Sequence, residues 1–498
     1  MGRRNIPIAI GVQSSTSTAP SVPSSATPQS APYHARYVRP LGQTDMYLPI
    51  GNEPVTTTKK ISYVVITSNL LIPGDGQPVP NGALVVDKKI IVWVGTTAEI
   101  PAKYADKPHR KFHVPYLMPG LWDCHTHFSD PGDVVSSGAA GLTFIAGDGY
   151  GQGARLARGC WEAIQRGYTS MRDLAGYGCE IAAAIDEGAI IGPNIYSAGA
   201  ALSQTAGHGD IFALPAGDAL GNLGVNGTKH GYSNVQMACL VDGADECRRG
   251  VRLQIRRGAK CIKVLASGGV LSRDDNPMYA QFCKEELEAI VEESSRMERT
   301  VAAHCHGKPG ILAAARAGVT SIEHGTFTDE ECADLMIEKD IILVATRTIV
   351  DALIKTGGKD MPPIIWKKVQ LTNANHLTAY KLAIKKGVTI ALGTDTGPGY
   401  NMAIELQYAV EAGMSNLEAI KAATATAPRT VKGQAPLTGQ LKVGYEADIL
   451  GVLENPVEDV KILQKRENIN WVWKGGRLLK GPDVGPWGEE DHWVEDNS

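Results

Sequence analysis

Short apolar segments alternate with longer segments of helical periodicity from about residue 118 onward. Eight segments have the length and composition of strands: 118–127, 169–174, 194–200, 261–266, 301–306, 321–324, 341–346 and 389–394. Helical patterns lie between most of them, at 153–166, 245–257, 285–297, 311–317, 329–338 and 366–386. This alternation predicts a parallel sheet, and eight β-α units predict an α/β fold of the (β/α)8 TIM-barrel class.

The segments on either side of this region contain strand patterns without helices. Short apolar runs bounded by turn residues occur at 62–67, 82–86, 90–95, 439–453 and 471–478. We expect the flanking segments 59–117 and 432–480 to meet in one small β-sandwich domain, beside a barrel domain at 118–431.

The two ends of the chain have a different composition. Residues 1–58 are rich in Ser, Thr and Pro and contain no acidic residue before Asp45. Such a segment buries too little apolar surface to fold alone, so we expect an arm that is disordered or draped on a neighbour. Residues 481–498 form a C-terminal tail without a predicted structure.

Composition excludes some classes of protein. The chain is 43% hydrophobic and 20% charged with a net charge of −4, which is typical of a soluble enzyme and does not favour nucleic acid as a partner. No apolar run approaches the ~20 residues that a membrane-spanning helix needs. We expect a cytoplasmic or otherwise soluble protein without a clear secretory signal. An organelle transit peptide is the alternative, indicated by four arginines in the arm: Arg3, Arg4, Arg36 and Arg39.

Two histidines end the first strand candidate. His125 and His127 are two positions apart, and on a strand of period two both rings point the same way. Such a pair can bind one metal ion. Because any half-buried strand can carry two histidines on one face by chance, the other ligands must come from elsewhere in the chain.

Other metal-capable residues occur at the ends of later strand candidates, where barrel enzymes place their active-site side chains. They are Lys263 on the fourth, His304 on the fifth, His324 on the sixth and Asp395 after the eighth. The histidines and Asp395 could also have purely structural roles. A single histidine is commonly a core or surface residue, and Asp395 could cap the following helix.

Lys263 is unusual because it lies within the apolar run Ile-Lys-Val-Leu, where a cation is costly to bury. Its amine could reach the barrel mouth, form a buried ion pair, or be chemically altered. A desolvated lysine has a lowered pKa, and its neutral amine can add carbon dioxide to give a carbamate that bridges two metal ions.

This ligand pattern resembles that of the binuclear amidohydrolase superfamily, and the resemblance extends from about residue 61 to residue 480. The Ala-Asp-Ile-Leu sequence around Asp448 is similar to the terminal sandwich strands of that family. Further motifs resemble fungal members that cleave the amide joining phenylalanine to an isocoumarin acid. These motifs are Pro-Gly-Leu-Trp-Asp-Cys-His-Thr-His-Phe from Pro119, Arg-Asp-Leu-Ala-Gly-Tyr-Gly from Arg172, and residues 200–210, 266–277 and 481–488.

The resemblance implies a role for each ligand candidate. His125, His127 and Asp395 would hold the buried metal ion, His304 and His324 the outer ion, and a carbamate on Lys263 would bridge two divalent ions, with zinc the expected metal. A hydroxide shared by the ions would attack the amide carbonyl, and Asp395 would carry the proton to the leaving amine. The implied substrates are N-acyl aromatic or apolar amino acids such as ochratoxin A, cleaved to phenylalanine and ochratoxin alpha in a carboxypeptidase-like reaction.

Three residues are candidates for contacting the small-molecule substrate. His208 and His306 could hold the substrate carbonyl or carboxylate, or could instead orient metal ligands. Arg273 is a candidate for the carboxylate, although a loop arginine is usually solvated.

Other functions compatible with the same metal centre are dipeptide (prolidase-like) hydrolysis, ring-opening of cyclic amides, lactone hydrolysis and deamination. A non-enzymatic scaffold is a further alternative, which the six filled ligand positions disfavour. The resemblance also implies a symmetric homo-oligomer, with an octamer among the candidate states.

Overall fold

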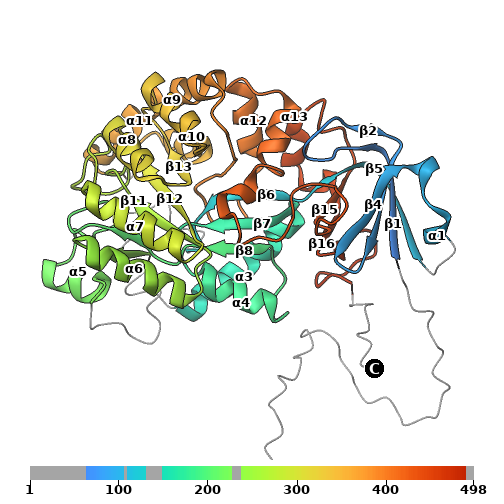
Figure 1. Cartoon of the computed structure of the whole chain (residues 1–498), viewed down its shortest axis with the longest axis horizontal. Helices are drawn as coiled ribbons and strands as arrows, with labels where there is room; N and C mark the ends of the chain where they lie inside the picture. Colours follow the sequence, from blue (N-terminus) through green and yellow to red (C-terminus); the bar gives the residue numbers. More distant parts are fainter. Residues whose placement is uncertain (1–62, 106–108, 130–148, 227–236, 360, 490–498) are drawn as a thin grey trace, which may run out of the picture. The chain divides into compact units, whose positions relative to one another are not determined.

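A computed structural model describes residues 63–105, 109–129, 149–226, 237–359 and 361–489 (Figure 1). The arm predicted at 1–58 and the last nine residues of the predicted tail lie outside the described residues. The described part of the tail packs on the domain: Trp161 Nε1 donates a hydrogen bond to Pro486 O at 2.8 Å, and Glu489 N donates to Leu478 O at 2.9 Å.

The flanking segments of the chain meet in one mixed sheet of eight strands. Its order is β17-β16-β15-β5-β1-β3-β4, with β2 paired to β1. The strands are β1 (Tyr63–Leu71), β2 (Val79–Pro80), β3 (Gly82–Asp87), β4 (Ile90–Thr96), β5 (His109–Pro119), β15 (Ile449–Val452), β16 (Ile469–Lys474) and β17 (Arg477–Lys480). Antiparallel pairing of β15 with β5 places Leu450 opposite Met118. The prediction that the two flanking segments pair with each other is therefore confirmed, in the form of one sheet.

The central region forms parallel strands in two further sheets. The first has the order β6-β7-β8, with β6 (Leu121–Thr126), β7 (Tyr168–Asp173) and β8 (Asn194–Ser197). The second has the order β10-β9-β11-β12-β13-β14, with β9 (Ala201–Ser203), β10 (Ala238–Leu240), β11 (Cys261–Leu265), β12 (Thr300–Cys305), β13 (Ser321–His324) and β14 (Ile342–Val344). The predicted α/β class with parallel pairing is confirmed.

The first strand candidate, 118–127, was wrong as a single strand. Met118 and Pro119 end β5, and β6 begins after Gly120. A Cβ at Gly120 would lie 2.0 Å from Thr169 Oγ1, so only glycine fits this close approach. Gly120 N donates to Asp448 O at 2.9 Å in the mixed sheet, and the next residue enters the parallel sheet. Gly120 therefore marks where the chain passes from one sheet to the other.

The eighth strand candidate, 389–394, was wrong as a regular strand. Among the described residues it takes part in one isolated parallel bridge, between Leu343 and Ile390. Its backbone nevertheless touches both neighbours that a closing strand would have, because Cys124 N donates to Leu392 O at 2.8 Å and Ala391 N donates to Leu343 O at 3.1 Å. A positive φ of 59° at Asp395 interrupts the extended backbone. The parallel strands thus occupy separate sheets and not one continuous ladder.

Helices lie between and around these strands (Figure 1). They are α1 (Ala102–Ala105), α3 (Gly149–Gln165), α4 (Gly178–Asp186), α5 (Ala216–Leu223), α6 (Ala244–Arg257), α7 (Lys284–Arg296), α8 (Lys308–Ala317), α9 (Glu330–Glu338), α10 (Arg347–Lys355), α11 (Pro363–Lys386), α12 (Ile404–Glu411) and α13 (Asn416–Ala422). All six predicted helical segments are helical. Their apolar faces share one buried cluster with the parallel strands, including Val251, Ile262, Ile290 and Ile322. Among the described helices, none has an apolar stretch that could cross a bilayer.

Candidate metal centre

The C-terminal ends of the parallel strands bring five of the six predicted ligands together in two neighbouring groups, with the sixth, Lys263, beside the first of them. The first group contains His125 on β6, His127 just after it and Asp395, whose ligand atoms lie within 4.8 Å of one another. Asp395 Oδ1 is 2.9 Å from His127 Nε2 and 3.5 Å from His125 Nε2. The two histidines do point the same way, as the strand period predicts.

The second group contains three histidines. The ligand atoms of His304, His306 and His324 also lie within 4.8 Å of one another. The prediction placed His306 at the substrate, and the structure places its buried ring beside both outer ligand candidates. His306 Nδ1 is 2.7 Å from Thr326 Oγ1, and His324 Nδ1 is 2.7 Å from Thr346 Oγ1. These hydroxyls set the direction of the two rings.

Lys263 lies beside the first group. Its side chain on β11 is buried, and Nζ is 3.3 Å from His125 Nε2. Among the described residues no carboxylate forms an ion pair with it. Burial lowers the pKa of Lys263 to about 8, because the ammonium loses its hydration. Compared with an exposed lysine, a larger share of Lys263 is therefore the neutral amine, the form that can react with carbon dioxide.

Burial also keeps four of these histidines neutral. It lowers the pKa of His125 to about 4 and that of His306 to about 3, and it holds the pKa values of His304 and His324 well below the usual range. Burial alone would raise the pKa of the Asp395 carboxyl, but the nearby His125 and His127 rings hold it below its usual range. Neutral imidazoles with a carboxylate form a donor set suited to a divalent ion such as zinc.

A buried ion pair that the sequence analysis did not single out orients His125. Glu323 Oε2 on β13 is 2.8 Å from His125 Nδ1, and Arg172 Nη2 on β7 donates to Glu323 Oε1 at 2.7 Å. Both charged side chains are fully buried. Burial alone would raise the pKa of Glu323, but the Arg172 guanidinium lowers it to about 2. The signal was present in the sequence, since Glu323 and Arg172 are charges within strand candidates, as Lys263 is.

Replacing Arg172 by methionine should lower the free energy of unfolding by about 3–5 kcal/mol, because Glu323 would stay buried without its cation. Urea denaturation of the purified protein measures this loss. Arg248→Met is the matched control, since Arg248 is partly exposed and its ion pairs are long, at 3.3 and 3.5 Å. Equal effects of the two substitutions would contradict a stabilising role for the buried pair.

A second buried carboxylate connects β6 to the segment that carries Asp395. Asp123 Oδ1 accepts hydrogen bonds from His125 N at 3.0 Å and Thr394 N at 3.1 Å, and its Oδ2 accepts from Thr394 Oγ1 at 2.6 Å. Asp395 N in turn donates to His125 O at 2.7 Å. These contacts hold the two chain segments of the first group in register, although Asp395 is not on a regular strand.

The other two substrate-contact candidates lie in different surroundings. The ring of His208 stacks on that of His304, with centroids 4.5 Å apart and an interplanar angle of 27°. The side chain of Arg273 is 75% exposed and lies 3.7 Å from the neighbouring Asp274. The structure therefore brings His208 to the histidine cluster and leaves Arg273 in solvent.

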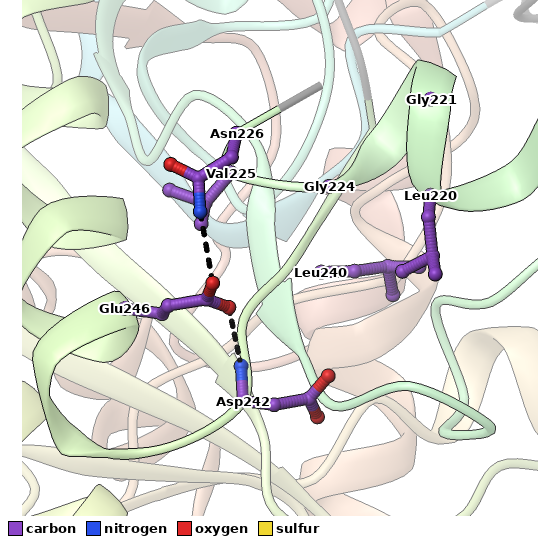
Figure 2. A pocket seen from close by; sticks show the side chains of 8 residues that line it. All are labelled: Leu220, Gly221, Gly224, Val225, Asn226, Leu240, Asp242 and Glu246. Carbon is purple, nitrogen blue, oxygen red and sulfur yellow. Dashed lines mark hydrogen bonds between the residues drawn. The ribbon is translucent and has the colours of Figure 1, made fainter. Parts of the chain in front are cut away.

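A separate pocket of about 280 Å³ lies between α5, β10 and α6 (Figure 2). Its carboxylate Glu246 already accepts hydrogen bonds from Asn226 Nδ2 at 2.8 Å and Asp242 N at 3.0 Å. None of the predicted site residues lines this pocket. We therefore take the histidine cluster, and not this pocket, as the candidate functional site.

The chain is similar to known proteins in both sequence and structure. The model of the "Amidohydrolase family" matches residues 116–479. Ochratoxinase from Aspergillus niger is 56% identical over 437 residues, covering 88% of this chain and 90% of that relative. The crystal structure of A. niger ochratoxinase has a TM-score of 0.82 and 57% sequence identity, covering 86% of this chain and 98% of the other. A prolidase solved with N-methylphosphonate-L-proline has a TM-score of 0.75 at 30% identity, and the match covers 84% of this chain and 100% of the prolidase.

Proposed function

This chain belongs to the amidohydrolase family and is a metal-dependent hydrolase, and we propose that it cleaves the amide bond of N-acyl aromatic and apolar amino acids. The resemblance to fungal amidohydrolases that the motifs indicate is confirmed by these similarities. The observation that carries the substrate proposal is the 56% identity to ochratoxinase over most of both chains. Ochratoxin A is therefore the first substrate to test, with phenylalanine and ochratoxin alpha as products.

We propose that the site holds two divalent ions, zinc by preference. His125, His127 and Asp395 would hold one ion, His304 and His324 the other, and a carbamate on Lys263 would contribute to both. The two groups of convergent ligand atoms, the neutral imidazoles and the buried lysine beside His125 support this assignment. When bound, such ions lower the pKa of a coordinated water to about 7 and polarise the scissile carbonyl.

The proposed role of Asp395 is proton transfer. Its carboxyl stays ionised beside His125 and His127, so Oδ1 can accept the proton of the attacking water. The same oxygen would then give the proton to the amine nitrogen as the amide C–N bond breaks. The products are a carboxylic acid and a free amino acid. The buried Glu323 keeps His125 directed at this carboxylate throughout.

We propose that His208 and His306 contact the substrate, holding its carbonyl or its carboxylate. Both rings pack against His304, with centroid distances of 4.5 and 4.7 Å. The His208 side chain is 22% exposed and can therefore be reached from solvent. Arg273, whose side chain is 75% exposed, stays a candidate for contacting the substrate carboxylate.

The finer architecture is part of the same proposal. We propose that the eight β-α units close into a (β/α)8 barrel at 118–431 beside a β-sandwich formed by 59–117 and 432–480. Closure is supported on one side by the hydrogen bonds of segment 389–394 and on the other by Lys260 N, which donates to Ser197 O at 2.7 Å. We also propose that the protein forms a symmetric homo-oligomer, with an octamer among the candidate states.

A dipeptidase is the second candidate function. The similarity to the prolidase solved with N-methylphosphonate-L-proline favours it. In both reactions a carboxyl group lies next to the scissile amide, so the same His208 and His306 contacts would serve either substrate. Side-chain preference at the released amino acid separates the two candidates.

Metal removal and a substrate panel test the proposed function. Zinc-loaded protein should release phenylalanine from ochratoxin A and from N-acyl-phenylalanines, and chelation should abolish that release until zinc is returned. Chromatography of the released amino acid measures the reaction, with dipeptides of phenylalanine and proline in parallel. Release from no amide, with about two ions still bound per chain, would contradict amide cleavage and point to a lactone, a cyclic amide or deamination.

A further inference from the structure

Lys368 on α11 is a buried cation whose contacts are concentrated in one loop. Its side chain is 9% exposed, and Nζ donates to Gly269 O at 3.2 Å, to Ser272 O at 2.9 Å and to Asp275 Oδ1 at 2.9 Å. A lysine ammonium has three donors, so all of them are used on the loop at 268–276. Burying a cation costs free energy, and these three contacts offset that cost. The same contacts fix the loop against α11.

Asp275 extends this connection to His208. Its carboxylate is 2% exposed and accepts hydrogen bonds from Gly269 N at 2.6 Å and from the Ser272 hydroxyl. His208 Nδ1 lies 2.8 Å from Ser272 Oγ and 3.5 Å from Asp275 Oδ2. Because the Ser272 hydroxyl donates to Asp275, it accepts from His208, which places the ring proton on Nδ1. Within the described part of the chain, Nε2 of this ring makes no hydrogen bond.

The backbone of the loop also confines the His208 ring. A Cβ at Gly269 would lie 1.9 Å from His208 Cε1, so the ring packs directly on the glycine backbone. The same ring stacks on His304. The next loop residue, Val270, is buried in an apolar cluster with Ile349 and Val369 of α10 and α11. The loop is therefore attached to these two helices by both charge and apolar contact.

We propose that Lys368 is a positioning residue that clamps the loop at 268–276 and thereby holds the His208 ring over His304 with Nε2 free for the substrate. This inference rests on the proposed function, in which His208 contacts the substrate carbonyl or carboxylate. Lys368 itself acts only through Asp275, Ser272 and the loop backbone. Its loss should reduce the productive binding of substrate and leave the metal ligands in place.

A double-mutant cycle tests the proposal on the zinc-loaded enzyme. Lys368→Met should lower kcat/KM by about 10- to 100-fold, the range for residues that orient a site from behind it. The same substitution in a His208→Ala background should cause little further loss, because both changes remove one positioned ring. Metal content per chain should stay unchanged in all variants. Equal losses in the two backgrounds, or no loss in either, would overturn the proposal.

Lys367→Met is the matched control, since Lys367 is the exposed neighbour on the same helix. It should leave kcat, KM and metal content as in the wild type. Where Lys368→Met fails to fold, Asp275→Asn replaces it in the cycle, because it weakens the same ion pair at constant side-chain size. The expected coupling to His208→Ala is the same.

Hydrogen exchange gives a readout that does not need a known substrate. Peptides covering 268–276 and 204–210 of the zinc-loaded protein should exchange faster in Lys368→Met than in Lys367→Met. If the wild type hydrolyses no amide in the panel, the proposed function is contradicted. The exchange experiment still tests whether Lys368 fixes the loop at 268–276. Unchanged exchange in both peptides would refute the clamp whatever the substrate.

Discussion

Replacing Lys263 by alanine should remove bound metal and hydrolytic activity together. The substitution deletes a buried lysine beside the histidine cluster, whose Nζ lies 3.3 Å from His125 Nε2. If the amine carries a carbamate, alanine removes the anionic ligand shared by both ions, and activity should fall to that of the chelated enzyme. Metal analysis and amide hydrolysis on the same preparation measure both effects.

Short carboxylates provide the decisive control for this variant. Formate, acetate or propionate should enter the space left by the side chain and restore part of the metal content and activity, because each supplies the two oxygens of the lost carbamate. Lys260→Ala, at an exposed lysine just before β11, should change neither property. Full activity of Lys263→Ala without added carboxylate would remove Lys263 from the site.

Asp395→Asn should leave the fold intact and lower kcat by at least about 10²- to 10⁴-fold, the usual contribution of a positioned acid-base group. The amide keeps the size of the side chain, and the backbone bond from Asp395 N to His125 O does not depend on it. The amide cannot accept and return a proton as the carboxylate does. Turnover of the best amide substrate and circular dichroism of the same sample measure the outcome.

Metal content separates the two roles of Asp395. Loss of turnover with metal retained supports the proton-carrying role, and loss of both shows that ligation dominates. Asp340→Asn serves as the control, since that carboxylate is 76% exposed and pairs with Arg429 on the surface. Near-normal turnover of Asp395→Asn would mean that another residue carries the proton.

Local periodicity was sufficient to predict most of the parallel strands, six of the helices and the strand ends at which ligand candidates lie. A strand of period two sets which face a side chain occupies, and parallel strands place their carboxyl ends at one edge, so His125, Lys263, His304 and His324 could be expected together. Sequence spacing could not show that Gly120 divides two strands, because the reason is a contact with Thr169 in another strand. The irregular backbone before Asp395 could not be predicted either, because it too depends on contacts with segments that are remote in the sequence.

The sequence by itself determined the α/β class, the parallel pairing and the candidate ligands, because these depend on residue type and on repeats within a few positions. Only the tertiary structure decided which groups support them: Arg172 with Glu323 behind His125, and Lys368 with Asp275 behind His208. These partners are separated by between 67 and 198 positions in the chain. Their distances depend on how remote strands and helices pack, and a buried charge is stable only where that packing supplies its partner.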